Sequence, residues 1–228
     1  MKKSLGFFVR YGFKGMSRVR KNKHIISKFD DKIGIVYFGS VDQKSDDHEV
    51  IRGFTVSSTH VDNHYSVGSI NGYDIALTNR TDVISQTNNS FVDYEWLVMS
   101  FKLHTKQDLP HIFIKSKQHN DKPYELLFDI FPVMQEVELG VFEEYSKDFT
   151  SRFTLFSQPT KSIEAERLLP ATTARVLAAH FWPLSIEVAD GVLYVYSDSN
   201  NIDMNLLDNM LKDGLWLADF LDVRAEVI

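Results

Sequence analysis

The side chains with the clearest potential for chemistry stand on a short segment around residue 62. His60, Asp62 and His64 alternate with other residues, so on a β-strand all three would share one face. Two imidazoles and a carboxylate are ligands that zinc and related ions accept, and His48 could supply a fourth. Eight histidines in 228 residues also produce such spacings by chance. We therefore expect an exposed polar strand or loop without bound metal, and keep His60, Asp62 and His64 as metal-site candidates.

Neighbouring acidic residues are the second group that could act chemically. The pairs are Glu136 with Glu138, Glu143 with Glu144, and Asp46 with Asp47. A catalytic carboxylate needs an apolar pocket that raises its pKa, whereas polar residues surround these pairs, so a solvated face is the expected role. The chain also contains no glycine-rich phosphate loop, zinc-protease motif or nucleophile elbow. We predict no catalytic residue and no cofactor, and the sequence favours a protein that is not an enzyme.

Composition excludes several classes of protein. The absence of cysteine excludes a disulfide scaffold and any metal site built on thiolates. Hydrophobic residues at 43% and charged residues at 25% are typical of a folded globular chain rather than a disordered one. No apolar run approaches the ~20 residues that a spanning helix needs. Arg10 interrupts the first apolar stretch and no small-residue cleavage site follows, so we expect no cleaved leader and a cytoplasmic protein.

Charge divides the chain into a basic arm and an acidic body. Residues 1–28 contain nine Lys and Arg and no acidic residue, so the other 200 residues carry 16 basic and 31 acidic side chains, a net charge of −15. Such a division indicates an interaction with an acidic partner or surface. Because the body is acidic, we expect no nucleic acid partner for it.

The arm has the pattern of a basic amphipathic helix. On a helical wheel Phe8, Val9, Phe13 and Met16 fall on one side, with Leu5 and Val19. The opposite side carries Arg10, Lys14, Arg18 and Lys21, with Lys3. This arrangement is typical of helices that lie in an anionic membrane interface. Gly6, Gly12 and Gly15 each lower helix propensity by about 1 kcal/mol, and Arg20 falls in the apolar sector. Two alternatives stay open: a helix docked on its own core, or a basic tail, which could also contact nucleic acid.

Hydrophobic periodicity predicts strands first and helices later. Strands are expected over residues 33–38, 91–104 and 111–117, the last two paired with each other, and an edge strand over 149–157. Two type I′ hairpins are expected, around Asn71-Gly72 and Asp190-Gly191. Helices are expected over 162–169 and 170–181. The last helix begins near an Asn201 N-cap and has one apolar face: Leu207, Met210, Leu211, Gly214, Leu217, Ala218 and Leu221.

This order predicts an α+β fold. We expect an antiparallel sheet built mainly from the first ~150 residues, and a C-terminal helix–hairpin–helix unit over residues 160–221 packed on its end. The predicted domains are the basic amphipathic arm, 1–28, and a single α+β domain, 29–228, with a sub-boundary near residue 148.

From Phe149 onwards the sequence resembles a bacterial family defined only as a domain of unknown function. The shared features are Phe149 and Phe153, Ala165 with Leu168-Leu169-Pro170, Ile186-Glu187-Val188 leading through Gly191 to Leu193-Tyr194, and the helix from Leu207 to Leu221. That family often carries transmembrane helices before this region. The resemblance, over about eighty residues, implies a membrane-proximal cytosolic domain without known activity or catalytic residues. This chain has the amphipathic arm where those helices would lie.

The sequence therefore favours a non-enzymatic bacterial domain at the inner surface of a membrane, with anionic lipid or a protein as partner and no identified small-molecule ligand. Two alternatives are a soluble acidic scaffold or adaptor that binds another protein through a sheet edge, and an enzyme with a His or carboxylate site outside known motifs.

Overall fold

The structure is a computed structural model that describes residues 19–41, 60–85, 91–118, 134–198 and 201–226. In these residues, nine antiparallel strands form one sheet. The strands are β1 (Val36–Val41), β2 (His60–Ile70), β3 (Tyr73–Ser85), β4 (Phe91–Lys102), β5 (Ile112–Ser116), β6 (Gln135–Glu136), β7 (Phe153–Ser157), β8 (Ser185–Ala189) and β9 (Val192–Ser197). Their order across the sheet is β1-β2-β3-β4-β9-β8-β5-β7-β6. This antiparallel sheet, together with the helices described in the next paragraph, confirms the predicted α+β class.

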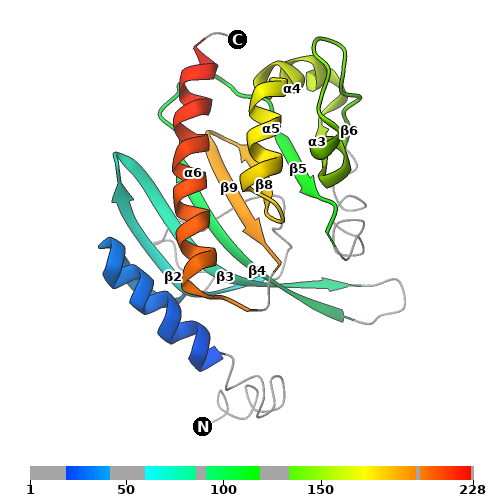
Figure 1. Cartoon of the computed structure of the whole chain (residues 1–228). Helices are drawn as coiled ribbons and strands as arrows, with labels where there is room; N and C mark the ends of the chain where they lie inside the picture. Colours follow the sequence, from blue (N-terminus) through cyan, green and yellow to red (C-terminus); the bar gives the residue numbers. More distant parts are fainter. Residues whose placement is uncertain (1–18, 42–59, 86–90, 119–133, 199–200, 227–228) are drawn as a thin grey trace.

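Helices cover one face of this sheet (Figure 1). They are the N-terminal helix (residues 19–33), α3 (Lys147–Arg152), the 3₁₀ turn η1 (Pro159–Lys161), α4 (Ser162–Leu168), α5 (Ala171–His180) and α6 (Met204–Ala225). Helix α6 runs across the middle of the sheet, with the N-terminal helix beside its first turns and α4 and α5 on its other side.

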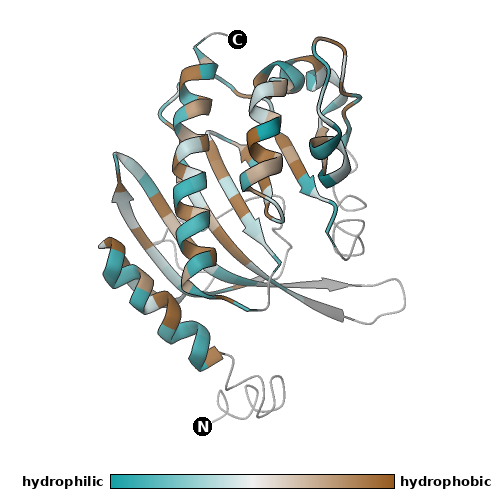
Figure 2. Ribbon diagram, in the orientation of Figure 1, coloured by the Kyte–Doolittle hydropathy of each residue, from teal (hydrophilic) through white to brown (hydrophobic). Residues whose placement is uncertain are grey.

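The main core lies between the sheet and these helices. It joins Ile26 and Phe29 of the N-terminal helix to Leu77, Met99 and other residues of the sheet, and to the inner faces of α5 and α6. In Figure 2 the strands β5, β8 and β9 beneath the helices are mainly brown, whereas the helices carry teal and brown on different sides, as amphipathic helices do. A second cluster, with Trp96, Val98 and Tyr196, occupies the opposite face.

Two hairpins connect neighbouring strands at the expected dipeptides. Asn71 and Gly72 have φ of 52° and 88° between β2 and β3, and Asp190 and Gly191 have φ of 51° and 73° between β8 and β9. Positive φ at both central residues is the requirement of a type I′ turn, which Asn-Gly and Asp-Gly meet at low cost.

The strand expected over residues 33–38 begins later, because the N-terminal helix continues to residue 33. Gly34 ends the helix with φ of 78°, and the N–H groups of Gly34 and Ile35 both donate to the Asp30 carbonyl (2.8 and 3.1 Å). This is a glycine-terminated helix end, and β1 follows it at Val36. The predicted domain boundary at residue 28 falls inside this helix.

The expected pairing of segment 111–117 with segment 91–104 is wrong. Strand β5 lies between β7 and β8, and β4 pairs with β3 and β9. The β8–β9 hairpin is inserted between β4 and β5, and such a long-range insertion leaves no trace in local periodicity.

The C-terminal region also differs from its expected position. Residues 147–152 form α3, and β7 starts only at Phe153 and lies inside the sheet rather than at its edge. Strands β8 and β9 are likewise internal, so the helix–hairpin–helix unit does not sit on the end of the sheet. That residues 160–221 fold as one cooperative unit stays a prediction.

The buried face of helix α6 agrees closely with the predicted apolar face. Of the seven residues expected on that face, six are buried and Leu211 is half-buried. The N-cap is Asp203 rather than Asn201, since its carboxylate accepts the Leu206 N–H at 2.8 Å. Gly214 lies against the ring of Phe101 on β4, where an added Cβ would come within 2.3 Å of ring carbons.

We predict that Gly214→Ala lowers the free energy of unfolding by about 1–3 kcal/mol, because the methyl group would displace Phe101 or the helix. Helix propensity alone predicts the opposite, a gain of about 1 kcal/mol. Urea denaturation decides between them, with Asn209→Ala on the exposed side of α6 as the control that gains propensity without a clash. A Gly214→Ala protein as stable as the wild type would contradict the close approach of α6 to β4.

Candidate functional site

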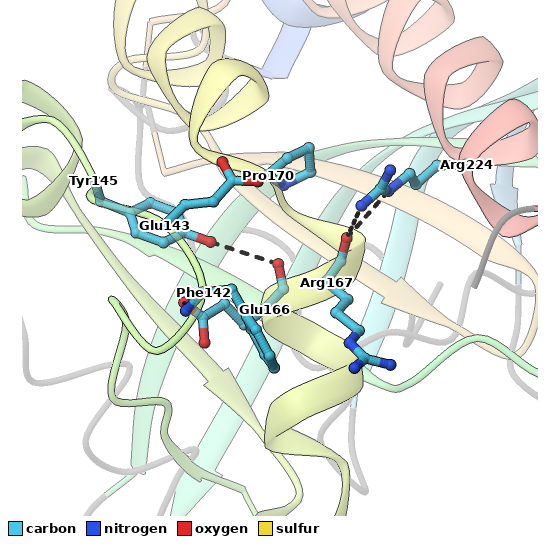
Figure 3. A pocket seen from close by; sticks show the side chains of 7 residues that line it. All are labelled: Phe142, Glu143, Tyr145, Glu166, Arg167, Pro170 and Arg224. Atoms are coloured by element: carbon cyan, nitrogen blue, oxygen red, sulfur yellow. Dashed lines mark hydrogen bonds between the residues drawn. The ribbon is translucent and has the colours of Figure 1, made fainter.

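A cavity of about 290 Å³ lies where the loop before α3 meets α4, the start of α5 and the end of α6. Figure 3 shows its lining side chains. Two are basic, two are acidic and two are aromatic; the full set is Phe142, Glu143, Tyr145, Glu166, Arg167, Pro170 and Arg224. The cavity therefore brings together four charged groups from three separate segments of the chain.

Glu166 holds the loop on one side of this cavity. Its side chain is buried, and its Oε1 accepts the N–H groups of Gly140, Val141 and Phe142 at 2.9, 3.0 and 3.3 Å. Three N–H groups converging on one oxygen form an anion-binding nest, filled here by the chain's own carboxylate. Glu166 therefore shapes the loop.

Glu143 and Tyr145 satisfy helix ends at the same corner. The Oε2 atom of Glu143 accepts the N–H of Ala171, the first residue of α5, at 2.9 Å, and the hydroxyl of Tyr145 donates to the Leu169 carbonyl at 2.6 Å. The free N–H and C=O groups of helix termini need such partners. Burial, together with the negative charge of Glu166, raises the pKa of Tyr145 and keeps its hydroxyl a donor.

The two arginines of the cavity differ in their partners. Nε and Nη2 of Arg224 donate to the Arg167 carbonyl in the last turn of α4, at 3.1 and 2.9 Å. This bond ties the end of α6 to α4, and a cation is favourable near the C-terminus of a helix. The guanidinium of Arg167 instead lies over the Phe142 ring, 5.1 Å from its centroid.

A second group of polar residues lies beneath the N-terminal helix. Asp30 is 1% exposed, and its Oδ2 accepts the Ser66 hydroxyl of β2 at 2.6 Å. Its Oδ1 is buried and has no hydrogen-bond partner. Burial is the main reason that the pKa of Asp30 rises from 3.8 to about 6, with the neighbouring charge of Asp31 adding to it. Burial of this kind shifts the protonation equilibrium of a carboxyl group towards the neutral form.

His64 and Tyr37 form a second pair at this helix. The Tyr37 hydroxyl and Nδ1 of His64 lie 2.9 Å apart, and Lys23 lies 6.0 Å from the centroid of the Tyr37 ring. Burial, and then the charge of Lys23, lowers the pKa of His64, which favours its neutral form. Burial and the nearby Asp30 raise the pKa of Tyr37.

The proposed metal candidates do not share one face. A bulge in β2 between Asn63 and Ser66, with φ of 56° at His64, inverts the alternation of side chains. Asp62 therefore faces the second cluster and binds Arg80 through two hydrogen bonds of 2.7 and 3.0 Å, whereas His64 faces Tyr37 beside the helices. The side chain of His60 lies outside the described part. Within that part, no three His, Asp or Glu side chains gather as a metal site would require.

Most of the predicted membrane-contact residues, namely Phe8, Val9, Arg10, Phe13, Lys14, Met16 and Arg18, lie outside the described residues. Lys21 is described and exposed, and its Nζ donates to Asn201 Oδ1 at 2.9 Å, next to the start of α6. None of the described helices is long and apolar enough to cross a membrane.

Sequence reasoning missed a buried polar network on the second face of the sheet. Glu187 is fully buried, and its two oxygens lie 2.6 Å from Nε2 of His111 and 2.5 Å from the Tyr196 hydroxyl. Burial and then the charge of Glu187 raise the pKa of Tyr196 well above its usual value. Only the register of β5, β8 and β9 brings these residues together, so no sequence spacing could have shown it.

Comparison with known proteins identifies a fold but no family. No protein-family model matches the chain, and no curated protein matches it. Among solved structures, the mycobacterial trehalose monomycolate transport factor A, TtfA, is similar, with a TM-score of 0.56 and 11% sequence identity over 90% of this chain and 95% of that chain. At this identity the similarity shows a shared fold and nothing more.

We predict that Asp30 makes the stability of the protein fall as pH rises through the weakly acidic range. Because the folded pKa of about 6 exceeds the usual 3.8, the folded state holds this proton more tightly. The resulting stabilisation is complete below about pH 4 and is lost as pH passes 6. Relative to Asp30→Asn, the free energy of unfolding of the wild type should fall by on the order of 1–3 kcal/mol between pH 4 and pH 7.

Urea denaturation across this pH range measures the effect. Asp219→Asn removes the same charge from an exposed position of α6 that does not contribute to the pKa of Asp30, and it is the matched control. If wild type and Asp30→Asn change in parallel with pH, Asp30 does not hold the proton.

Proposed function

We propose that this chain is a non-enzymatic, membrane-proximal domain that attaches reversibly to an anionic membrane surface through residues 1–28. The observation that carries the proposal is the run of nine Lys and Arg without an acidic residue, ahead of a body with a net charge of −15. Each cation contributes up to ~1 kcal/mol near an anionic leaflet. The location that follows is the cytoplasmic side of a bacterial inner membrane.

The geometry of the N-terminal helix supports this assignment. Its apolar side is used in folding, since Ile26 and Phe29 are fully buried in the main core. Its basic residues stay at the surface: Arg20, Lys21, Lys23 and Lys28 are all exposed. The docked helix can therefore contribute charge to a membrane contact, while Phe8, Val9, Phe13 and Met16 would contribute apolar burial.

The charge of the body supports an end-on orientation. An acidic body is repelled by anionic lipid, so only the end that carries the arm can approach the surface.

A sheet edge favours a second candidate function, that of an adaptor for another protein. Strand β1 lies at one edge of the sheet, and its Val36 and Phe38 are 57% and 48% exposed. An edge strand with apolar side chains suits the addition of a partner's strand.

We predict that the intact chain co-sediments at low salt with vesicles containing equal parts of phosphatidylglycerol and phosphatidylcholine, and much less with phosphatidylcholine alone. Binding should weaken steeply with added salt, because exposed charges are screened within about 10 Å at 0.1 M. The variant Phe8→Ser with Phe13→Ser keeps every Lys and Arg. It should lose vesicle binding at moderate salt while its binding to DNA or RNA barely changes.

The matched control is Ile163→Ser with Val223→Ser, two exposed apolar residues of α4 and α6. This variant should bind vesicles like the wild type. A wild-type chain that stays in the supernatant with anionic vesicles at low salt would refute membrane attachment.

A further inference from the structure

The cavity beside α4 contains two cations that form no ion pair with its own acidic residues. Arg167 and Arg224 line it together with Glu143 and Glu166, yet no ion pair joins either arginine to either glutamate. Instead, Glu166 accepts three loop N–H groups and Glu143 accepts the first N–H of α5. The two carboxylates are thus committed to the backbone.

Donor groups of both arginines stay available to a ligand. Arg224 uses Nε and Nη2 on the Arg167 carbonyl, which leaves Nη1. Arg167 is exposed, and among the described residues its guanidinium forms no hydrogen bond or ion pair and lies over the Phe142 ring. A guanidinium presents five N–H donors in a planar fork that matches phosphate and carboxylate groups.

An apolar surface lies next to these donors. Phe142 is 48% exposed and Val141 is 67% exposed, on the loop that Glu166 fixes from within. A volume of about 290 Å³ is at the small end for a ligand pocket. The cavity therefore suits a compact molecule with an anionic group and a small apolar part.

We propose that this cavity binds the phosphate or carboxylate group of a small organic anion. The free N–H groups of Arg167 donate to the oxyanion and the apolar part of the ligand lies against Phe142. Arg224, whose guanidinium lies on the other side of the Arg167 carbonyl in Figure 3, adds positive charge to the cavity. Charge-assisted hydrogen bonds of this kind are about twice as strong as neutral ones. The cavity lies at the C-terminal end of α6. Lys21 of the arm binds Asn201, which lies just before the N-terminal end of α6, so anion binding in the cavity is independent of membrane attachment.

The test uses the full chain with phenyl phosphate and benzoate as probes, and inorganic phosphate as the probe without an apolar part. Titrations at constant ionic strength follow the Nε–H signal of Arg167 by NMR, and calorimetry gives the dissociation constant. Saturable binding of phenyl phosphate or benzoate is expected, with inorganic phosphate weaker. The stronger of the two aromatic probes identifies the anionic group that the site prefers.

Arg167→Gln should weaken binding about tenfold or more without unfolding the protein, since the side chain of Arg167 has no role in holding the helices. Arg175→Gln, an exposed arginine of α5 away from the cavity, is the matched control and should bind like the wild type. Arg224→Gln is the less decisive variant because it also removes the bond to α4.

The proposal is overturned if no probe gives a saturable shift of the Arg167 signal, or if Arg175→Gln weakens binding as much as Arg167→Gln does. The second result would mean that the anions only screen the surface charge of the protein.

Discussion

The contact between Gly214 of α6 and the ring of Phe101 on β4 is the one on which the other parts of the structure depend. A side chain at 214 would meet that ring at 2.3 Å, so α6 reaches the sheet only because residue 214 has none. With the helix this close, Leu207, Met210 and Leu217 complete the main core. Asp222 of α6 accepts the Tyr73 hydroxyl at 2.8 Å and the N–H groups of His104 and Thr105 at 2.9 and 2.8 Å, which fixes the helix lengthwise on the sheet.

This placement of α6 separates two regions of the molecule. Near its start, Lys32 of the N-terminal helix pairs with Asp208 at 2.6 Å, and Lys21 binds Asn201 just before the helix. At its end, Arg224 holds α4 and borders the cavity. A helix of 22 residues spans roughly 33 Å, so a membrane contact through the arm and an anion in the cavity would not compete for space (Figure 1).

Features set by neighbours in sequence could be predicted, and features set by distant pairing could not. The Asn71-Gly72 and Asp190-Gly191 turns and the apolar face of α6 follow from local residue types and were identified at the correct residues. The insertion of β8 and β9 beside β5 depends on long-range register, as does the pairing of Glu187 with His111 and Tyr196. The bulge at His64 changes the alternation of side chains along β2, so the partners of Asp62 could not be predicted from a regular strand. The cavity is lined by four segments that share no sequence motif.

In the proposed membrane attachment the arm, and no other part of the chain, enters the membrane interface. The chain has no cysteine, so Phe13→Cys and Val223→Cys each provide one unique position for a spin label. On anionic vesicles, the label at residue 13 should gain collisions with oxygen relative to a water-soluble nickel chelate, while the label at residue 223 should keep the accessibility that it has in solution. If the label at residue 13 stays as accessible to the chelate as in free protein, the arm does not enter the interface and the proposed membrane attachment is wrong.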